Sequence, residues 1–180
     1  AHCRNLTGSP VCGDKVESMY YAYANCVNLT GSPVVGKSVV NMAEVYRYCN
    51  NLTGSPVSGE QVTNMYAAYG ECSNLTGAPV CGNNVINMAN AYYYCYNITG
   101  SPVCGNKVTS MAETYYNCQN LTGSPVCGPN VTNMVNSYGD SNIAGNPVSG
   151  NNVTFFSYTY YNCLSLTGTP ACGPNVTDMS

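Results

Sequence analysis

Apolar residues recur along this chain at a spacing that predicts short helices. Val16, Met19, Tyr23 and Cys26 lie at offsets of 0, 3, 7 and 10 residues. On an α-helix these offsets place all four side chains on one face. The same spacing predicts a helix of two to three turns at each of four further copies: Val39/Met42/Tyr46/Cys49, Val62/Met65/Tyr69/Cys72, Val85/Met88/Tyr92/Cys95 and Val108/Met111/Tyr115/Cys118.

Between the predicted helices lies a second segment, Leu-Thr-Gly-Ser-Pro-Val, which is too short for a helix. We interpret it as a short strand followed by a corner, because a proline inside a strand would remove a ladder hydrogen bond. The glycine that closes the segment, Gly36 for example, is expected at a positive φ. The corner prolines are Pro10, Pro33, Pro56, Pro79, Pro102, Pro125, Pro147 and Pro170.

Together the two segments form a unit that occurs eight times. The step between copies is 23 residues, except for one step of 22 between Leu121 and Ile143. A fixed period of this size indicates a repeat solenoid, here with a short strand and a short helix in each 23-residue rung. The leucine or isoleucine that marks each copy is Leu6, Leu29, Leu52, Leu75, Ile98, Leu121, Ile143 or Leu166.

A single rung cannot bury its own apolar face, but stacked rungs bury it as internal columns. We therefore expect residues 1–180 to form one array of about eight rungs without capping repeats, either a fragment of a longer array or a subunit that stacks end to end. The rung near 139–158 is irregular, because one residue is missing and Phe156 replaces the expected methionine. This irregularity is either drift with a local kink or a bend that serves as a contact site.

The segment at 62–76 reads Val-Thr-Asn-Met-x-x-Ala-x-x-x-Cys-x-x-Leu-Thr, and 131–138 repeats its first half closely. This pattern resembles the BspA-like leucine-rich repeats of bacterial surface proteins, and the resemblance covers the whole chain. It implies an α/β coil like that of leucine-rich repeats, and a cell-surface or phage-borne binding module instead of a catalyst. The unit differs from that family in being a few residues shorter and in having Gly-Ser-Pro-Val where the usual strand is Leu-x-Leu.

The composition excludes several classes of function. Only 7% of the residues are charged, the net charge is −3, and the five Lys and Arg residues are scattered, so no basic stripe for nucleic acid can form. No run of 18 apolar residues predicts a membrane span. His2 is the single histidine, and there is neither a phosphate-binding loop nor a Cys-x-x-Cys motif. We therefore expect no catalytic residues, no metal site and no cofactor.

The twelve cysteines fall into two ranks nine residues apart: every second-rank cysteine has a first-rank partner, and the rung that lacks the first also lacks the second, with Ser141 and Ser149 in their places. This covariation predicts disulfides and, with them, an extracellular location. The alternative is a ladder of buried, reduced thiols. The predicted pairs are Cys3–Cys12, Cys72–Cys81, Cys95–Cys104, Cys118–Cys127 and Cys163–Cys172, with Cys26 and Cys49 paired between neighbouring rungs.

Nine Asn-x-Ser/Thr sequons are candidate glycosylation sites. Alternatively, their amides form a ladder that satisfies backbone groups at the bend. The nine are Asn5, Asn28, Asn51, Asn74, Asn97, Asn120, Asn130, Asn152 and Asn175.

Two kinds of tyrosine are present. One kind recurs on the predicted core face, and the other varies from rung to rung and is expected to be more exposed. Tyrosine makes contacts at a low entropic cost. We therefore take Tyr93, Tyr94, Tyr96 and Tyr116 as the candidate binding face, with packing between rods as the alternative use.

These observations favour a non-enzymatic extracellular structural protein that forms a rod or an end-to-end filament, with itself as partner. The alternative is an adhesin or phage-fibre module at a cell or virion surface that recognises a glycan or a surface protein. A third hypothesis is ice binding, which would use one rank of threonines: Thr7, Thr30, Thr53, Thr76, Thr99, Thr122 and Thr167.

Overall fold

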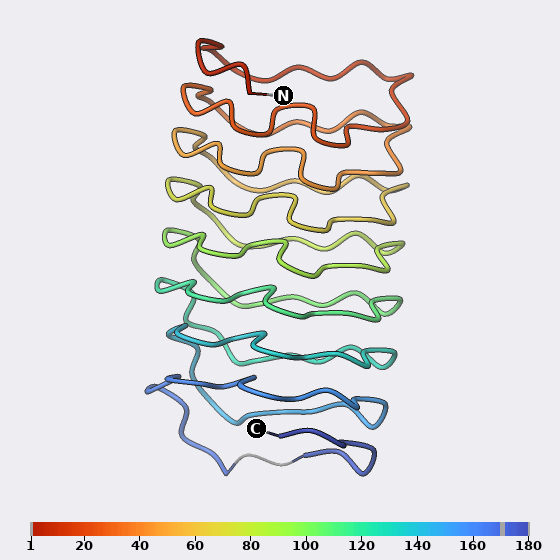
Figure 1. Cartoon of the computed structure of the whole chain (residues 1–180), viewed down its shortest axis with the longest axis vertical. Coiled ribbons are helices and arrows are strands. Elements are labelled where there is room, and N and C mark those ends of the chain that lie inside the picture. Colours follow the sequence, from red (N-terminus) through yellow and green to blue (C-terminus); the bar gives the residue numbers. More distant parts are fainter. Residues whose placement is uncertain (1, 170–171, 180) are drawn as a thin grey trace.

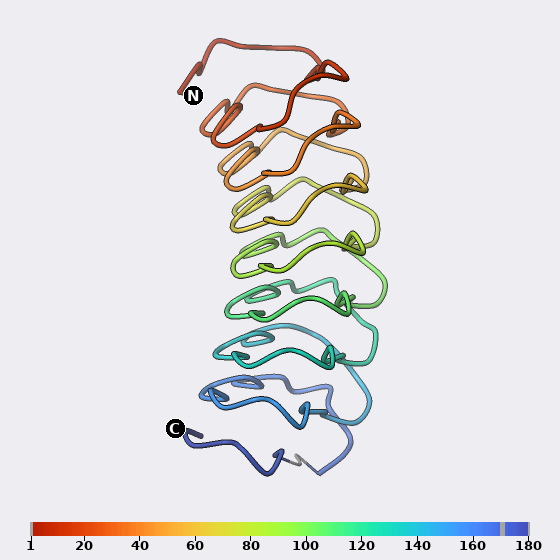
Figure 2. The ribbon, with the colours of Figure 1, turned by 90° about the vertical axis from the view of Figure 1, so that its right-hand side faces the viewer.

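A computed structural model describes residues 2–169 and 172–179. The corner predicted at Pro170 lies outside the described residues. Within them, the chain winds into a column of coils that lie one above another, with the N- and C-termini at opposite ends (Figure 1). Figure 2 shows the same column from the side, where each coil follows its predecessor in sequence order.

In the part of the chain that the structure describes, the predicted helices are absent, and the predicted strands are reduced to isolated bridges, for example at Leu29, Leu121 and Leu166. Among the described residues there is no helix, and pairing between coils is limited to parallel bridges of single residues. The bridges are Gly8–Leu29, Ser18–Asn41, Asn41–Asn64, Asn64–Asn87, Asn87–Ser110, Gly100–Leu121, Ser110–Asn133, Asn133–Phe155, Gly145–Leu166 and Phe155–Asp178. The α/β coil expected from the sequence is therefore replaced by a coil made of turns.

Each regular coil is built from β-turns, four of which turn their ends to the interior; a fifth, Asn90–Tyr93 in the coil that starts at Cys72, has partly exposed ends. In the coil that starts at Cys72, each turn is closed by a hydrogen bond from the N–H of its fourth residue to the C=O of its first, at N···O distances of 2.9–3.1 Å. The four turns are Cys72–Leu75, Gly82–Val85, Met88–Ala91 and Tyr92–Cys95. All of these residues except Gly82 are buried, at 0% exposure. A hydrogen bond between residues i and i+3 places the side chains of both residues on the same side of the backbone. In this coil that side is the interior.

Turns of this kind explain why the sequence suggested a helix. A helix and a series of turns both return an apolar residue to one face every three or four positions. The difference lies in the backbone: Asn90 has φ 59° and Tyr94 has φ 55°, which is left-handed backbone that interrupts an α-helix. The N–H groups of Asn90 and Tyr94 then donate to Ala112 and Tyr116 of the next coil, at 2.8 and 2.9 Å.

An asparagine precedes four of the seven methionines and organises the third turn of those coils. The Oδ1 atom of Asn87 accepts the N–H of Ala89 at 2.9 Å, and Asn41, Asn64 and Asn133 make the equivalent bond at 2.9–3.0 Å. Short side chains that bond to backbone two residues ahead favour turns over helices. This asparagine therefore selects a turn where the apolar spacing alone leaves a helix open.

Positive φ angles occur at the first glycine of the repeat, not at the second as expected. Gly31, Gly54 and Gly77 have φ of 80–82°, and they precede the Ser-Pro or Ala-Pro corner. The second glycine serves for close approach instead. A Cβ added at Gly105 would lie 2.9 Å from Cys81 Sγ and 3.2 Å from the Gly82 carbonyl oxygen of the preceding coil.

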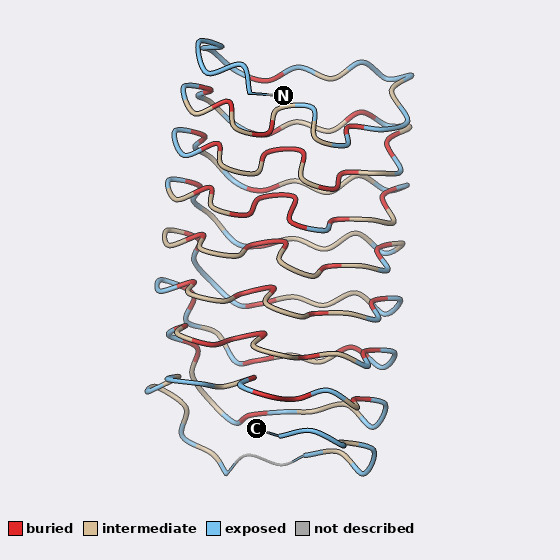
Figure 3. Cartoon of the chain, viewed as in Figure 1, coloured by how far each residue is buried: buried red, intermediate tan, exposed pale blue. Residues whose placement is uncertain are grey.

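The core is a set of vertical columns, buried most fully in the middle coils (Figure 3). The tyrosine column consists of Tyr23, Tyr46, Tyr69, Tyr92, Tyr115, Tyr138 and Tyr160. Its neighbouring ring centroids are 5.6–5.7 Å apart, and their planes differ by only 1–14°.

Each hydroxyl of the tyrosine column spans its coil. Tyr92 Oη donates to the C=O of Val80 at 2.7 Å and accepts the N–H of the same residue at 3.0 Å. Equivalent donor bonds join the other six column tyrosines to Val11, Val34, Val57, Val103, Val126 and Val148. The column thus supplies both apolar contact and the hydrogen bonds that the opposite backbone segment needs.

The irregular rung near 139–158 does not interrupt the columns. The missing residue lies between Ser141 and Ile143, and Tyr138 still stacks on Tyr160 at 5.7 Å. Phe156 is buried at 6% exposure, with its ring edge-on to Tyr160 at 5.7 Å. The deletion is therefore accommodated locally, in the segment that follows Ser141.

Candidate functional site

The structure brings the four predicted surface tyrosines together, and we call Tyr93, Tyr94, Tyr96 and Tyr116 the tyrosine cluster. Tyr93 stacks on Tyr116, with centroids 5.4 Å apart and planes 18° apart. Tyr94 lies at the centre, with its centroid 4.5 Å from Tyr93, 5.7 Å from Tyr96 and 5.4 Å from Tyr116. These contacts are close enough for aromatic pairing, so the cluster forms one surface.

Local backbone geometry sets the direction of these rings. The turn Tyr92–Cys95 buries its first and last residues, while Tyr93 and Tyr94 between them remain partly exposed. Gly139 leaves room for the last ring of the cluster, because a Cβ there would lie 3.0 Å from Tyr116 Cδ2. The cluster therefore depends on both a turn and a neighbouring glycine.

A hollow of about 220 Å³ adjoins the cluster. The perpendicular rings of Tyr94 and Tyr96, 89° apart, form one corner of it. Glu71, Asn50 and Ser73 complete the lining, so the site contains two aromatic rings, one carboxylate and two small polar side chains. We did not identify Asn50, Glu71 and Ser73 from the sequence. Glu71 holds the position that Tyr94 holds in the next coil, and a carboxylate there in place of the tyrosine could have indicated the site.

Carboxylates surround the cluster and shift its phenol groups. Burial, followed by the nearby Tyr94, Glu113 and Glu71, raises the pKa of Tyr93 to about 12. A hydrogen bond with Asp140 is the main cause of the raised pKa of Tyr116. Burial is the main cause of the raised pKa of Tyr96, and the nearby Tyr94 and Glu71 add to it. The phenols of Tyr93, Tyr96 and Tyr116 are thus neutral at physiological pH, and the charge beside them comes from the acids.

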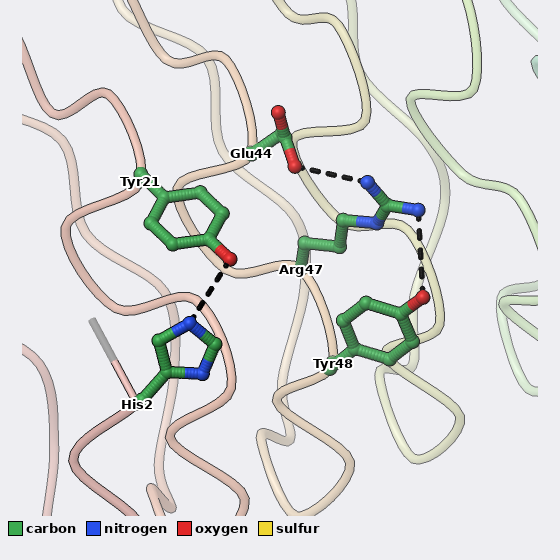
Figure 4. Close-up of polar contacts among 5 residues, drawn as sticks. All are labelled: His2, Tyr21, Glu44, Arg47 and Tyr48. Atoms are coloured by element: carbon green, nitrogen blue, oxygen red, sulfur yellow. Dashed lines mark hydrogen bonds and ion pairs between the residues drawn. The ribbon is translucent and has the colours of Figure 1, made fainter.

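Arg47 occupies the position equivalent to Tyr93 two coils earlier, and its guanidinium already has partners. Arg47 donates to Glu44 at 2.9 Å and to the hydroxyl of Tyr48 at 3.4 Å, as Figure 4 shows, and its guanidinium lies 4.9 Å from the Tyr48 ring centroid. Figure 4 also shows a separate contact, Tyr21 with His2 at 3.3 Å. In the described part of the chain only one other salt bridge is found, Lys37–Asp14, so Glu71 has no ionic partner there.

All twelve cysteines are free thiols in the structure, so none of the predicted disulfides is formed. The two ranks have different partners: Cys95 Sγ donates to the C=O of Tyr69 in the preceding coil at 3.0 Å, and Cys104 Sγ donates to the C=O of Gly105 at 3.6 Å. Burial raises the pKa of Cys104 to about 12 and that of Cys95 well above its ordinary value. Such thiols are poor nucleophiles.

The sequon asparagines line the outside of the stack. Eight of the nine are exposed, and Asn97 is half-buried. Several amides also bond to the preceding coil; Asn97 Nδ2, for example, donates to the C=O of Ser73 at 2.8 Å. Asn28, Asn130, Asn152 and Asn175 donate to backbone carbonyls in the same way, at 2.7–2.8 Å. A structural role for these amides is thus visible, and exposure leaves them open to glycosylation.

A wider groove of about 710 Å³ runs along a different face. It is lined by Thr109, Thr132 and Thr154 beside Asn130, Asn152 and Asn175, with Ile86 and Lys107 at one end. Each of the three threonine hydroxyls donates to a carbonyl of the preceding coil at 3.1–3.2 Å. The sequence reasoning did not identify this groove, because its walls come from successive coils.

Searches for other kinds of site and for relatives give little further information. No group of three or more His, Cys, Asp or Glu residues that could hold a metal ion occurs within 2–169 and 172–179. Over the same residues, no helix has the length and apolarity needed to cross a membrane. Comparison of the chain with protein-family models, with curated proteins and with solved structures finds no match.

Proposed function

We propose that this chain is a non-enzymatic binding rod, displayed at a cell or virion surface, that uses the tyrosine cluster to recognise a glycan or a surface protein. The observation that carries the proposal is the contrast between a constant, buried rank and a variable rank next to it. The interior position of Tyr92 is tyrosine in seven coils. The position of Tyr93, which is partly exposed in that coil, is occupied by Arg47, Gly70, Tyr116 or Gly139 in neighbouring coils. A surface that varies over a constant scaffold is typical of a binding site.

The resemblance to BspA-like repeats of bacterial surface proteins supports the proposed location. The cysteines give no support to an extracellular location, because the disulfides that would favour it are not formed in the structure. A rigid scaffold with aromatic side chains on one face also suits recognition, because the rings lose little conformational freedom on binding.

The test uses substitutions that the chain itself contains at equivalent positions. The variant Tyr94→Asn/Tyr96→Ser introduces the residue types found at the equivalent positions of neighbouring coils, Asn117 and Ser73. The fold should therefore tolerate both changes. We expect the wild-type chain to bind bacterial cells or a glycan array, and the variant to lose at least tenfold in affinity while keeping its melting temperature within a few degrees.

The matched control is Tyr158→Asn, which removes an exposed tyrosine, 56% accessible, outside the cluster. Equal binding by the wild-type chain and the cluster variant would overturn the proposal, as would an equal loss in the control.

A second candidate, a structural filament, is favoured by the hydrogen bonding between coils. Met88 donates to Ser110 of the next coil at 3.1 Å, whereas Thr99 donates to Gly77 of the preceding coil at 2.9 Å. Both faces of a coil therefore carry donors and acceptors in complementary places, as sheet edges do. Sedimentation velocity and negative-stain microscopy over a range of concentrations test it: fibres with the diameter of the coil support this function, and monomers at every concentration contradict it.

A further inference from the structure

The hollow beside the tyrosine cluster combines features that suit one chemical class of ligand. Two tyrosine rings meet at 89° with centroids 5.7 Å apart, and the carboxylate of Glu71 lies on the same wall. Ring faces carry negative electrostatic potential, so a cation that contacts two of them is attracted by both. A carboxylate at the same place adds a full negative charge.

From this geometry we infer that the hollow formed by Glu71, Tyr94 and Tyr96 binds an ammonium group, either quaternary or a protonated primary amine. The inference rests on the proposed binding function and specifies the chemistry of its ligand. The carboxylate of Glu71 takes part in neither salt bridge found in the described part of the chain, so it is available to a cation from solution. Asn50 and Ser73 supply polar edges that can accept hydrogen bonds from a primary ammonium.

The size of the hollow limits what it can enclose. At about 220 Å³ it is smaller than the roughly 300–1,000 Å³ typical of pockets for drug-sized ligands. It therefore suits a head group or the end of a side chain, with the remainder of the ligand outside. Recognition would then extend from the hollow across the stacked rings of Tyr93 and Tyr116, which lie 5.4 Å apart on the same surface.

The surrounding charge excludes the opposite class of ligand. Burial is the main cause of the raised pKa of Tyr93, with Tyr94 and Glu113 adding to it, and the hydrogen bond with Asp140 is the main cause at Tyr116, so both acids lie near the cluster. The guanidinium of Arg47 is held by Glu44 and Tyr48. An anionic ligand would meet three carboxylates, whereas a cation would find a region of uncompensated negative charge.

The test is a titration of the full chain with small probes, followed by isothermal calorimetry or by NMR of the tyrosine rings. Choline represents a quaternary head group, n-butylammonium represents a lysine side chain, and 3,3-dimethylbutan-1-ol is the neutral isostere of choline. We expect the cations to bind and the alcohol to bind at least tenfold more weakly. Tighter binding of choline than of n-butylammonium indicates a quaternary ligand, and the reverse indicates an amine-bearing polymer or protein.

Two variants with the same change in net charge complete the test. Glu71→Gln keeps the shape of the hollow and should weaken choline binding about tenfold, whereas Glu60→Gln, outside the hollow, should change it less than twofold. Equal affinity for choline and its alcohol isostere, or an unchanged affinity in Glu71→Gln, would overturn the inference. If the cluster variant still abolishes binding to cells or glycans, the proposed function stands and only the ammonium assignment fails.

Discussion

Tyr92 and Tyr94 are two residues apart, of the same type, and used in opposite ways. Tyr92 is completely buried, stacks on Tyr69 and Tyr115, and bonds through its hydroxyl to both backbone groups of Val80. Tyr94 is partly exposed and contacts other rings of the cluster edge-on. The comparison teaches that in this protein the position within a turn, not the residue type, decides whether a tyrosine stabilises the stack or faces a partner.

Alkaline pH should break the tyrosine column completely. Burial raises the pKa of Tyr69, Tyr115 and Tyr138 well above the ordinary value of 10.0. A raised folded-state pKa means that the stabilisation is fully present below the unfolded-state pKa and is lost as pH rises above it. Buried thiols such as Cys49, whose pKa rises from 9.0 to about 12, add to this loss.

We therefore expect the tyrosine column to leave the free energy of unfolding independent of pH below pH 9. Above pH 10 the free energy of unfolding should fall steeply. Circular dichroism and tyrosinate absorbance, recorded together, should show column ionisation and unfolding at the same pH. Complete ionisation of the tyrosines with an unchanged dichroism spectrum would contradict the assignment.

Truncation of one ring should separate the two kinds of tyrosine most clearly. Tyr92→Ala leaves a cavity in the column and should cost about 3–5 kcal/mol of unfolding free energy. Tyr93→Ala, next to it in sequence but partly exposed, should cost about 1 kcal/mol or less, because it loses only a surface stack on Tyr116. Denaturant unfolding of both variants measures the difference, and similar costs would contradict the distinction.

Removal of the hydroxyl alone tests its bonds across the coil. Tyr92→Phe keeps the ring but leaves the N–H and C=O of Val80 without their partner, which should cost about 1–3 kcal/mol. Tyr158→Phe is the control, because its ring is 56% exposed and water can replace its hydrogen bonds. A Tyr92→Phe variant as stable as the control would show that the hydroxyl bridge does not contribute.

The smallest effect is expected at the buried thiols. Cys95→Ser replaces one donor with another, and the irregular coil already has serine at this position, where the Ser141 hydroxyl donates to the C=O of Tyr138 in its own coil instead of the preceding coil. We expect a cost of about 1 kcal/mol or less, because the new hydroxyl can donate to the Tyr92 carbonyl in the way that Ser141 donates to Tyr138. A loss of several kcal/mol in thermal or denaturant unfolding would mean that the thiol contributes chiefly by apolar packing.

The candidate site could be predicted only in part. Variation from repeat to repeat pointed to Tyr93, Tyr94, Tyr96 and Tyr116, and the structure places their rings in contact. The hollow beside them could not be found in this way, because Asn50, Ser73 and Tyr96 come from three successive coils. The disulfides predicted from covariation of the cysteines are not formed in the structure, where each rank of thiols has its own carbonyl partners.

The repeat period and the apolar positions were legible in the sequence alone, because a stacked chain must return equivalent side chains to the same column. Only the tertiary structure decided between helix and turn. Apolar spacing is nearly the same for both, and the choice depends on where the N–H groups find acceptors. Here the N–H of Asn90 donates to Ala112 of the next coil, and the bonds that a helix would make within one segment are made between coils instead.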